Sequence, residues 1–267
     1  MKLLNGLELA GFIKERQAKQ VRALRQAHKV FPKLAIVRTS DDPVIATYVR
    51  LKCRYGKEIL IDVDDYIVSN DELRATILRL NEDELVHGII IQLPLADTTQ
   101  TDEVLSLVAP EKDVDGLGRS PQFDAATPTA INWLLAGYGV ELHGKSVAIV
   151  GQGRLVGAPL SEMWEKSGIA VARFDETTSL AQLNTCDVVV TATGQPELIT
   201  SDMVKIGATV VDAGTATDNG RVVGDVSTEV RERDDITITP EKGGVGPLTV
   251  AALFDNVITA AQRRIRR

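Results

Sequence analysis

The sequence has 267 residues, 44% of them hydrophobic and 25% charged, which is typical of a globular protein that buries a substantial core. Its formal net charge of -7 at pH 7 argues against a surface that binds nucleic acid or docks on anionic membranes. No apolar run approaches the roughly 18 residues of a membrane span, so we expect a cytoplasmic protein of one large or two medium domains without a nucleic-acid or membrane partner.

Helical patterns alternate with short apolar runs along the first half of the chain. Near-continuous apolar strands separated by helices predict a parallel sheet that is covered on both faces. The predicted helices cover 7–27, 46–57 and 71–80, the last capped by Asp71, and the predicted strands cover 34–37, 58–61 and 88–91.

A polar, proline-containing stretch over 110–128 separates this pattern from a second one. A helix over 130–136 leads into a strand that runs directly into a glycine-rich turn. The predicted strands of this part are 145–150, 169–172, 187–190 and 208–212, and a last helix covers 248–264. The whole pattern predicts an α/β protein of two lobes with a cleft between them.

The glycine-rich turn lies between a predicted strand and a predicted helix. Glycines at such a turn let the backbone approach a pyrophosphate, which then lies at the positive end of the helix. The pattern has three residues, not two, before its last glycine, so a tight turn without a ligand is the alternative. Its context favours a dinucleotide site at Gly151-Gln152-Gly153-Arg154-Leu155-Val156-Gly157.

Asp175 ends the next predicted strand, where an acid commonly binds the hydroxyls of the adenosine ribose. A carboxylate at this position would repel the additional phosphate of NADP, and it therefore favours NAD. The alternative is that Asp175 caps the turn or helix that follows.

Four further segments carry residues suited to binding or chemistry. Tyr48 and Lys52 are spaced i and i+4, on one face of a predicted helix. The segment 92–95 follows the third strand at its carboxyl end, where open parallel sheets bind ligands. The segment 112–116 places two carboxylates in a turn, and glycines and prolines shape 239–249 into a loop before the last helix. Each segment alone also fits ordinary surface or turn chemistry.

The order of these segments resembles the bifunctional methylenetetrahydrofolate dehydrogenase/methenyltetrahydrofolate cyclohydrolase family. The order also excludes short-chain dehydrogenases, whose Tyr-x-x-x-Lys pair follows the glycine turn. The matching stretches are YVRLK, GIIIQLPL, APEKDVDG, the pair Thr127-Pro128, VGAP, ATGQPELI, GATVVDAG, GDV and GGVGPLT.

The resemblance implies a two-step reaction in one-carbon metabolism, which supplies purine biosynthesis. Methylenetetrahydrofolate is oxidised to methenyltetrahydrofolate with NAD or NADP, and the product is hydrolysed to 10-formyltetrahydrofolate. The resemblance further implies a homodimer, a catalytic and folate-binding domain over 1–120 joined by the C-terminal helix 247–267, and a Rossmann-like dinucleotide-binding domain over 121–246.

The resemblance also implies residue roles. Lys52 is the central catalytic residue of the hydration, Gln92 orients Lys52 or the substrate, Tyr48 stacks on the aminobenzoyl ring and Asp115 hydrogen-bonds the pterin. The implied folate-binding residues are Tyr48, Gln92, Pro94, Asp115, Gly243, Gly244, Pro247 and Thr249. The implied cofactor-binding residues are Gly151, Gln152, Gly153, Arg154, Val156, Gly157, Asp175, Thr193, Gly194 and Gly214. No metal is implied, and the two cysteines, Cys53 and Cys186, lack metal-ligand spacing.

Several positions depart from the family pattern. Ile45 replaces a serine near Lys52, which removes a hydroxyl from the hydration site and weakens the expectation of cyclohydrolase activity. Gln152 replaces an arginine that often holds the NADP phosphate, and Asp175 replaces a small hydroxyl residue that contacts it. Ala125-Ala126 replaces the Pro-Cys of the family pattern, and Glu241-Lys242-Gly243 replaces its Val-Pro-Gly. The two changes at the phosphate position both favour NAD.

Three other hypotheses stay open at this point. A dehydrogenase with weak or lost cyclohydrolase activity is suggested by Ile45, and a non-catalytic dinucleotide sensor is a second possibility. A third is a two-lobed NAD dehydrogenase that acts on small acids. Such an enzyme would need a catalytic His or Arg in the cleft, whereas His28, His87 and His143 fall at helix ends or before strands.

Overall fold

A computed structural model describes residues 2–218 and 221–265. The chain divides into two compact units, which we call the Lys52 unit and the Gly151 unit. The Lys52 unit is Gly11–Ala126 with Val250–Arg267, and the Gly151 unit is Met1–Ala10 with Thr127–Thr249. Helices α1 (Gly6–Ala27) and α8 (Val245–Ile265) each contribute residues to both units. The last two residues of the predicted helix 247–267 lie outside the described part of the chain.

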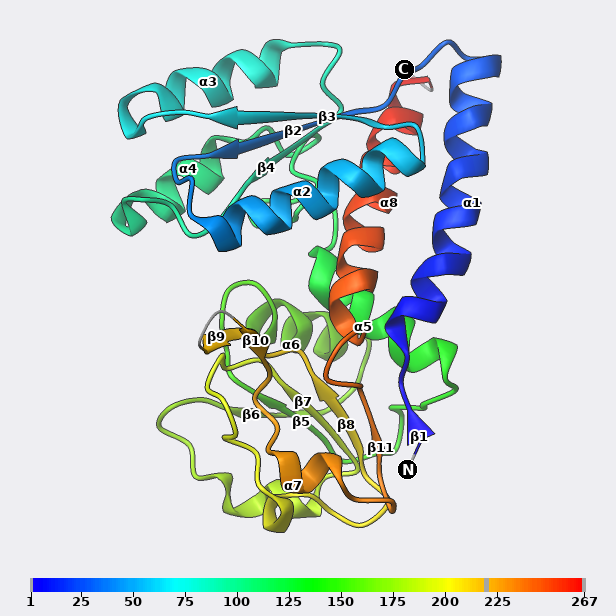
Figure 1. Ribbon diagram of the computed structural model, residues 1–267, viewed down its shortest axis with the longest axis vertical. Coiled ribbons are helices and arrows are strands. Elements are labelled where there is room, and N and C mark those ends of the chain that lie inside the picture. Colours follow the sequence, from blue (N-terminus) through cyan, green and yellow to red (C-terminus); the bar gives the residue numbers. More distant parts are fainter. Residues whose placement is uncertain (1, 219–220, 266–267) are drawn as a thin grey trace. The chain divides into compact units, whose positions relative to one another are not determined.

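The Lys52 unit contains a three-stranded parallel sheet in the order β3-β2-β4 (Figure 1). Its strands are β2 (Lys33–Arg38), β3 (Asp62–Ile67) and β4 (Gly88–Ile91). Its other elements are α2 (Pro43–Glu58), α3 (Asn70–Glu82), η1 (Thr98–Gln100) and α4 (Thr101–Leu107). Helices α3 and α4 pack on the sheet face that carries Ala35 and Val37 of β2. Central position in the sheet explains why Leu34 to Val37 are fully buried.

Helices α1, α2 and α8 are joined by a buried polar contact within the Lys52 unit. The Tyr55 hydroxyl of α2 donates to Gln17 Oε1 of α1 at 2.8 Å, and Gln17 Nε2 donates to Ala251 O of α8 at 2.8 Å. The rings of Tyr55 and Phe254 stack with centroids 5.1 Å apart. These contacts fix the helix that carries Lys52.

Two local predictions in this unit are wrong. The predicted strand 58–61 is the end of α2 and a turn in which Leu60 has φ 65°, and the strand begins at Asp62. Ile59 and Ile61 are apolar because they are buried in the turn, whereas β3 is an edge strand with a mostly polar sequence. Ser69, not Asp71, caps α3, because its hydroxyl accepts from Glu72 N while the Glu72 carboxylate accepts from Ser69 N.

The Gly151 unit contains a six-stranded parallel sheet in the order β1-β11-β8-β7-β5-β6. The strands are β1 (Lys2–Leu3), β5 (Val147–Val150), β6 (Val171–Phe174), β7 (Val188–Thr191), β8 (Thr209–Asp212) and β11 (Thr237–Ile238), and β9 (Ala216–Asp218) pairs antiparallel with β10 (Arg221–Val223). The helices are α5 (Ala126–Gly137), α6 (Gly157–Lys166), η2 (Leu180–Thr185), η3 (Ser201–Met203) and α7 (Thr228–Arg231). The prediction of an α/β protein built on parallel sheets is confirmed.

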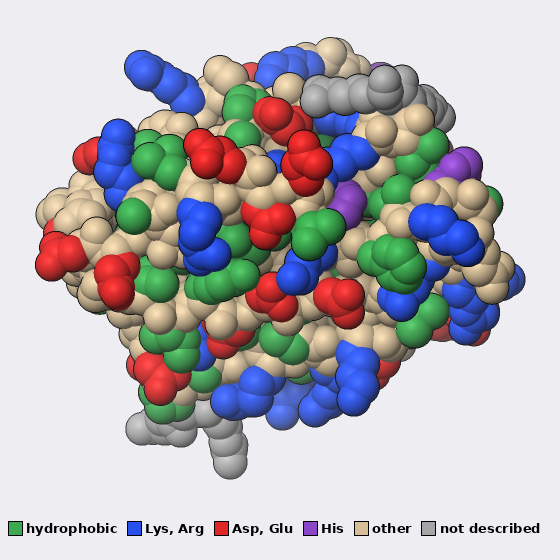
Figure 2. All heavy atoms as spheres, turned by 90° about the horizontal axis from the view of Figure 1, so that it is seen from above, with side chains coloured by type: hydrophobic (Ala, Val, Ile, Leu, Met, Phe, Trp, Pro, Cys, Tyr) green, Lys and Arg blue, Asp and Glu red, His purple; other side chains and the backbone are tan. Residues whose placement is uncertain are grey.

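Within residues 2–218 and 221–265, no helix is long and apolar enough to cross a membrane. On the face displayed in Figure 2, acidic and basic side chains are interspersed.

Candidate functional site

Lys52 and Gln92 meet at the carboxyl end of β4. Helix α2 begins at Pro43 with Asp42 as its cap, and Lys52 lies in its third turn. Gln92 directly follows β4, and Lys52 Nζ donates to Gln92 Oε1 at 2.7 Å. Gln92 Nε2 donates in turn to Leu93 O at 3.1 Å, which fixes the orientation of the amide. The lysine amine is therefore held in one place by a side chain from a different element.

The surroundings of Lys52 favour its neutral form. Burial lowers the pKa of Lys52, and the nearby carboxylate of Asp115 opposes this change. Burial raises the pKa of Asp115, which the Lys52 ammonium opposes and the Asp113 carboxylate reinforces. The structure thus brings Lys52, Gln92 and Asp115 together, as an amine and an acid whose charged forms are both disfavoured by burial.

In the turn that contains Asp115, the other charged side chains are used by the fold. The Asp113 carboxylate accepts from Gly116 N at 3.1 Å and Gly118 N at 2.8 Å, and Lys112 Nζ donates to Leu80 O at 2.8 Å. No described residue donates a hydrogen bond to the Asp115 carboxylate. The turn therefore presents one acid that is available to a ligand.

The face of α2 that carries Tyr48 is partly apolar and exposed. Tyr48 is 37% exposed, and Val44 and Leu51 on the same face are 38% and 45% exposed. Ile45, which replaces the serine of the family pattern, is buried. Pro94 is exposed and follows Leu93 through a cis peptide bond. The Tyr48 ring is thus available for stacking, one helical turn from Lys52.

The glycine turn of the Gly151 unit joins β5 to α6. Gly151 has φ 91°, and a Cβ at this position would lie 2.6 Å from Ala192 O. A Cβ on Gly157 would lie 1.7 Å from Gly151 O, so α6 packs directly against the end of β5. A Cβ on Gly153, in contrast, would meet nothing within 4 Å. Packing therefore requires Gly151 and Gly157, and it leaves the absence of a side chain at Gly153 unexplained.

The amide of Gln152 points into the protein. Its Nε2 donates to Ile149 O at 3.2 Å, and its Oε1 accepts from Ser161 Oγ at 3.2 Å. Ser161 is fully buried in α6, and the sequence patterns did not single it out. Of the neighbouring predicted residues, Arg154 is exposed and Val156 directly precedes α6.

Asp175 follows β6 and forms the turn after it. Its Oδ1 accepts from Thr177 N at 2.9 Å, from Thr177 Oγ1 at 2.7 Å and from Thr178 Oγ1 at 2.7 Å. These hydrogen bonds lower the pKa of Asp175 to about 2. The structure therefore shows the turn-capping role that was the alternative for Asp175, and a ribose-binding role stays a prediction.

Thr193, Gly194 and Gly214 lie just after β7 and β8. Two buried carboxylates contact this region, and the sequence patterns did not single them out. Asp225 is fully buried, and its Oδ2 accepts from Thr191 Oγ1 at 2.6 Å and Thr193 N at 2.7 Å. Asp212 accepts from Gly214 N at 3.1 Å and pairs with Arg231. The sequence did contain a signal for both residues. Asp212 ends an apolar strand in the segment VVDAG, and Asp225 follows a glycine in the segment GDV.

Replacement of Asp225 by Ala is expected to destabilise the protein by about 3 kcal/mol. The change would leave the Thr191 hydroxyl and the Thr193 N–H without their acceptor, and an unsatisfied buried donor costs about 1–3 kcal/mol. Thermal and denaturant unfolding would measure the loss. Asp202→Ala is the control, since Asp202 is an exposed acid with one threonine partner. Equal stability of the two variants would contradict the prediction.

The predicted folate loop belongs to the Gly151 unit. Gly243 has φ 83°, and its carbonyl accepts from Leu7 N at 2.9 Å. Gly244 packs so closely that a Cβ on Gly6 would lie 1.8 Å from its oxygen. Pro247 and Thr249 are in the first turns of α8, where Thr249 Oγ1 lies 3.3 Å from Val245 O. The loop is thus fixed by the start of α1.

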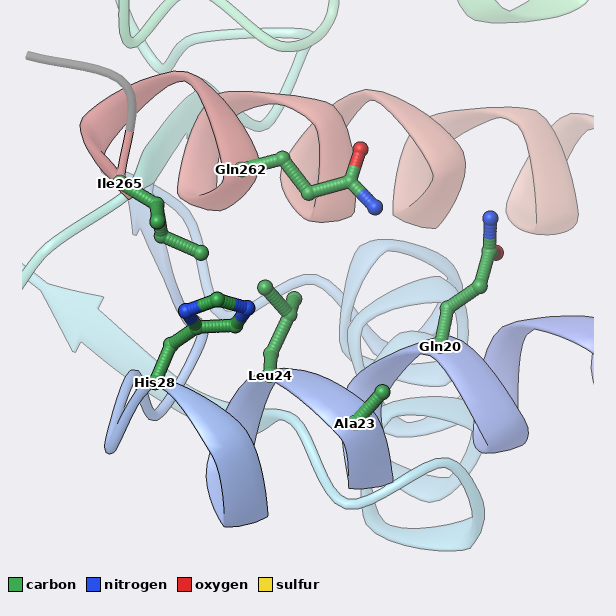
Figure 3. Close-up of a pocket in the computed structure, with 6 residues that line it drawn as sticks. All are labelled: Gln20, Ala23, Leu24, His28, Gln262 and Ile265. Carbon is green, nitrogen blue, oxygen red and sulfur yellow. The ribbon is translucent and has the colours of Figure 1, made fainter.

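A pocket of ≈ 380 Å³ lies between α1 and α8 of the Lys52 unit (Figure 3). None of the predicted site residues lines it. Among residues 2–218 and 221–265, no group of three His, Cys, Asp or Glu side chains is arranged to hold a metal ion. The residues that line the pocket are Gln20, Ala23, Leu24, His28, Gln262 and Ile265.

Comparisons with known proteins match both parts of the chain. Residues 4–115 match the tetrahydrofolate dehydrogenase/cyclohydrolase catalytic domain, and residues 125–265 match the NAD(P)-binding domain of the same family. The bifunctional protein FolD of Nitratiruptor sp. is 34% identical over 281 residues, which cover 100% of both chains.

Two solved structures are similar over nearly the full chain. The bifunctional enzyme FolD from Campylobacter jejuni has a TM-score of 0.93 and 34% identity, and the match covers 99% of each chain. The Trypanosoma brucei methylenetetrahydrofolate dehydrogenase-cyclohydrolase, solved with NADP and an inhibitor, has a TM-score of 0.92 and 31% identity. That match covers 99% of this chain and 98% of the other.

Proposed function

Because the chain belongs to the tetrahydrofolate dehydrogenase/cyclohydrolase family, we propose that it oxidises methylenetetrahydrofolate with NAD or NADP and then hydrolyses the product to 10-formyltetrahydrofolate. The observation that carries this proposal is the hydrogen bond of 2.7 Å between Lys52 and Gln92, near the carboxylate of Asp115, to which no described residue donates. The catalytic and folate-binding domain is 1–120 with 247–267, and it contains most of the Lys52 unit. The dinucleotide-binding domain is 121–246, and it contains most of the Gly151 unit.

The oxidation needs positioning more than acid–base chemistry. Methylenetetrahydrofolate is an aminal, and a nitrogen lone pair drives hydride out of the bridging carbon. A bound dinucleotide supplies the nicotinamide ring that accepts this hydride. Tyr48 stacks on the folate, and Asp115 hydrogen-bonds its pterin. Gly243, Gly244, Pro247 and Thr249 contribute the folate loop.

The hydrolysis uses Lys52 as a base. Water attacks the bridging carbon of the methenyl compound, and the neutral amine of Lys52 accepts one of the two water protons, which leaves a hydroxyl group on the carbon. One carbon–nitrogen bond then breaks as the remaining hydroxyl proton is transferred to that nitrogen, which gives the formyl product. Gln92 keeps the amine in place, and burial lowers the pKa of Lys52, which favours the neutral form.

The glycine turn fits a dinucleotide. Neither packing nor a positive φ requires glycine at position 153, so the open space above it suits a pyrophosphate against the backbone. Thr193, Gly194 and Gly214 lie at the carboxyl ends of the neighbouring strands, where this fold binds its cofactor. NAD is preferred over NADP, because Asp175 is an anion and Gln152 offers no positive charge.

The protein acts as a homodimer in the cytoplasm, as expected of its family. The isolated cysteines, Cys53 and Cys186, are both free thiols, which agrees with a reducing compartment.

A paired assay tests the proposal. Methylenetetrahydrofolate is supplied with NAD or NADP, and the methenyl and formyl products are followed separately against the enzyme-free rates. We expect enzyme-dependent formation of both products and a larger kcat/KM with NAD. Accumulation of the methenyl compound would instead favour the dehydrogenase with weak cyclohydrolase activity that Ile45 suggests. A tenfold preference for NADP would show that the roles given to Asp175 and Gln152 are wrong.

A further inference from the structure

Three hydrogen-bond donors converge on one oxygen atom of Asp175. They are the Thr177 N–H at 2.9 Å, the Thr177 hydroxyl at 2.7 Å and the Thr178 hydroxyl at 2.7 Å. We call these three donors the threonine nest. The turn is further closed by Thr178 N, which donates to Asp175 O at 3.2 Å. None of the three donors is bonded to the second carboxylate oxygen, Oδ2.

A convergent set of N–H and O–H donors is an arrangement that binds phosphate oxygens. The nest follows β6, which pairs with β5, and β5 ends in the glycine turn of the same unit. In dinucleotide-binding folds, the adenosine ribose lies at the end of this second strand. The 2′-phosphate that distinguishes NADP from NAD would therefore arrive at the nest.

We propose that the Asp175 carboxylate is a built-in occupant of an anion site formed by Thr177 and Thr178, and that this occupancy determines the choice of cofactor. The inference rests on the proposed function, in which the Gly151 unit binds NAD. Oδ1 fills the nest, while Oδ2 is left to accept the ribose hydroxyls of NAD. NADP is thus excluded twice, because its phosphate meets a negative charge and because the donors are already engaged.

The protonation of Asp175 agrees with this role. The threonine hydrogen bonds lower its pKa to about 2, so the carboxylate is charged at neutral pH. All three side chains are exposed, so variants at these positions leave the core unchanged.

Charge and occupancy can be separated by two substitutions. Asp175→Asn removes the charge, but its amide oxygen still accepts from the threonine nest. Asp175→Ala removes the charge and also vacates the nest. If repulsion alone sets the preference, the two variants gain equal affinity for NADP. If occupancy matters, the alanine variant gains more.

The experiment measures dissociation constants of NADP and NAD, and of 2′-AMP and 5′-AMP as fragments, for the wild type and both variants. We expect the Ala variant to bind NADP and 2′-AMP about tenfold or more tightly than the Asn variant, since hydrogen bonds to a charged group are worth about a factor of ten each. Adding Thr177→Val and Thr178→Val to Asp175→Ala should remove that gain. NAD and 5′-AMP should show no such difference.

Two results would overturn the inference. One is equal affinity of the Asn and Ala variants for NADP, and the other is a gain that persists without the threonine hydroxyls. Asp175→Gly repeats the test with a second residue that vacates the nest. A wild-type preference for NADP would contradict both the proposed NAD preference and the statement that occupancy of the nest determines the cofactor. The comparison of variants would still decide whether the vacated nest binds phosphate.

Discussion

Replacement of Lys52 by Met is expected to lower the cyclohydrolase rate by about 10²–10⁴-fold and to leave measurable hydride transfer. Methionine keeps the unbranched apolar stem but has no amine, so the proton acceptor for the attacking water is lost. The oxidation step needs no base and depends on substrate position alone. Separate measurement of the methenyl and formyl products distinguishes the two rates. Lys57→Met is the matched control, since Lys57 is an exposed lysine of the same helix.

The pH dependence of hydrolysis tests the same role. Burial lowers the pKa of Lys52, and activity is expected to fall on the acidic side as the amine becomes protonated. The Asp115 carboxylate favours the protonated form, so Asp115→Asn should lower the pKa further and move this acidic limb to lower pH. Full cyclohydrolase activity in the Lys52→Met variant, or a limb that moves to higher pH in the Asp115→Asn variant, would contradict the assignment.

The parallel α/β architecture was predictable because it depends on local patterns. Buried strands such as β2 and β4 are continuous apolar runs, and the turn after β5 has its glycines in sequence. The strand-end rule predicted only that the segment after β4 binds ligands, whereas the relation of Gln92 to Lys52, which lies in α2, was implied by the family resemblance.

Features that depend on pairing between distant segments were not predictable. The two-residue strand β1 exists because it pairs with β11, and neither segment has a pattern of its own. The apolar run at 59–61 indicated a strand, but burial of a turn gives the same composition as burial of a strand. Asp212 and Asp225 have separate places in the sequence, and only the fold brings them together, so that Asp225 N donates to Asp212 Oδ1 while Asp212 pairs with Arg231. Long-range contacts, rather than local propensity, decide these cases.

Gly157→Ala is expected to destabilise the protein, whereas Gly153→Ala is expected to leave its stability unchanged. A Cβ at position 157 would lie 1.7 Å from Gly151 O, which is a backbone atom that no side-chain rotation can move, so the turn and α6 must separate. Overpacking of this kind typically costs about 1–3 kcal/mol, and the distorted turn should also lose the dinucleotide. Position 153 has open space, so Gly153→Ala should leave the free energy of unfolding unchanged within about 0.5 kcal/mol.

The two glycine variants are most informative when their affinities for the cofactor are compared. If the Gly153 backbone approaches the pyrophosphate, an added methyl group separates them, and affinity for NAD should fall at least tenfold in a fully folded protein. Chemical denaturation and NAD titration of both variants make the comparison. Unchanged NAD affinity in Gly153→Ala would show that the ligand does not approach this glycine, and the open space above it would then need another explanation. A stable Gly157→Ala variant would show that α6 can shift away from β5 at little cost. Loss of affinity at one glycine without loss of stability, and loss of both at the other, is the result that a dinucleotide-binding turn requires.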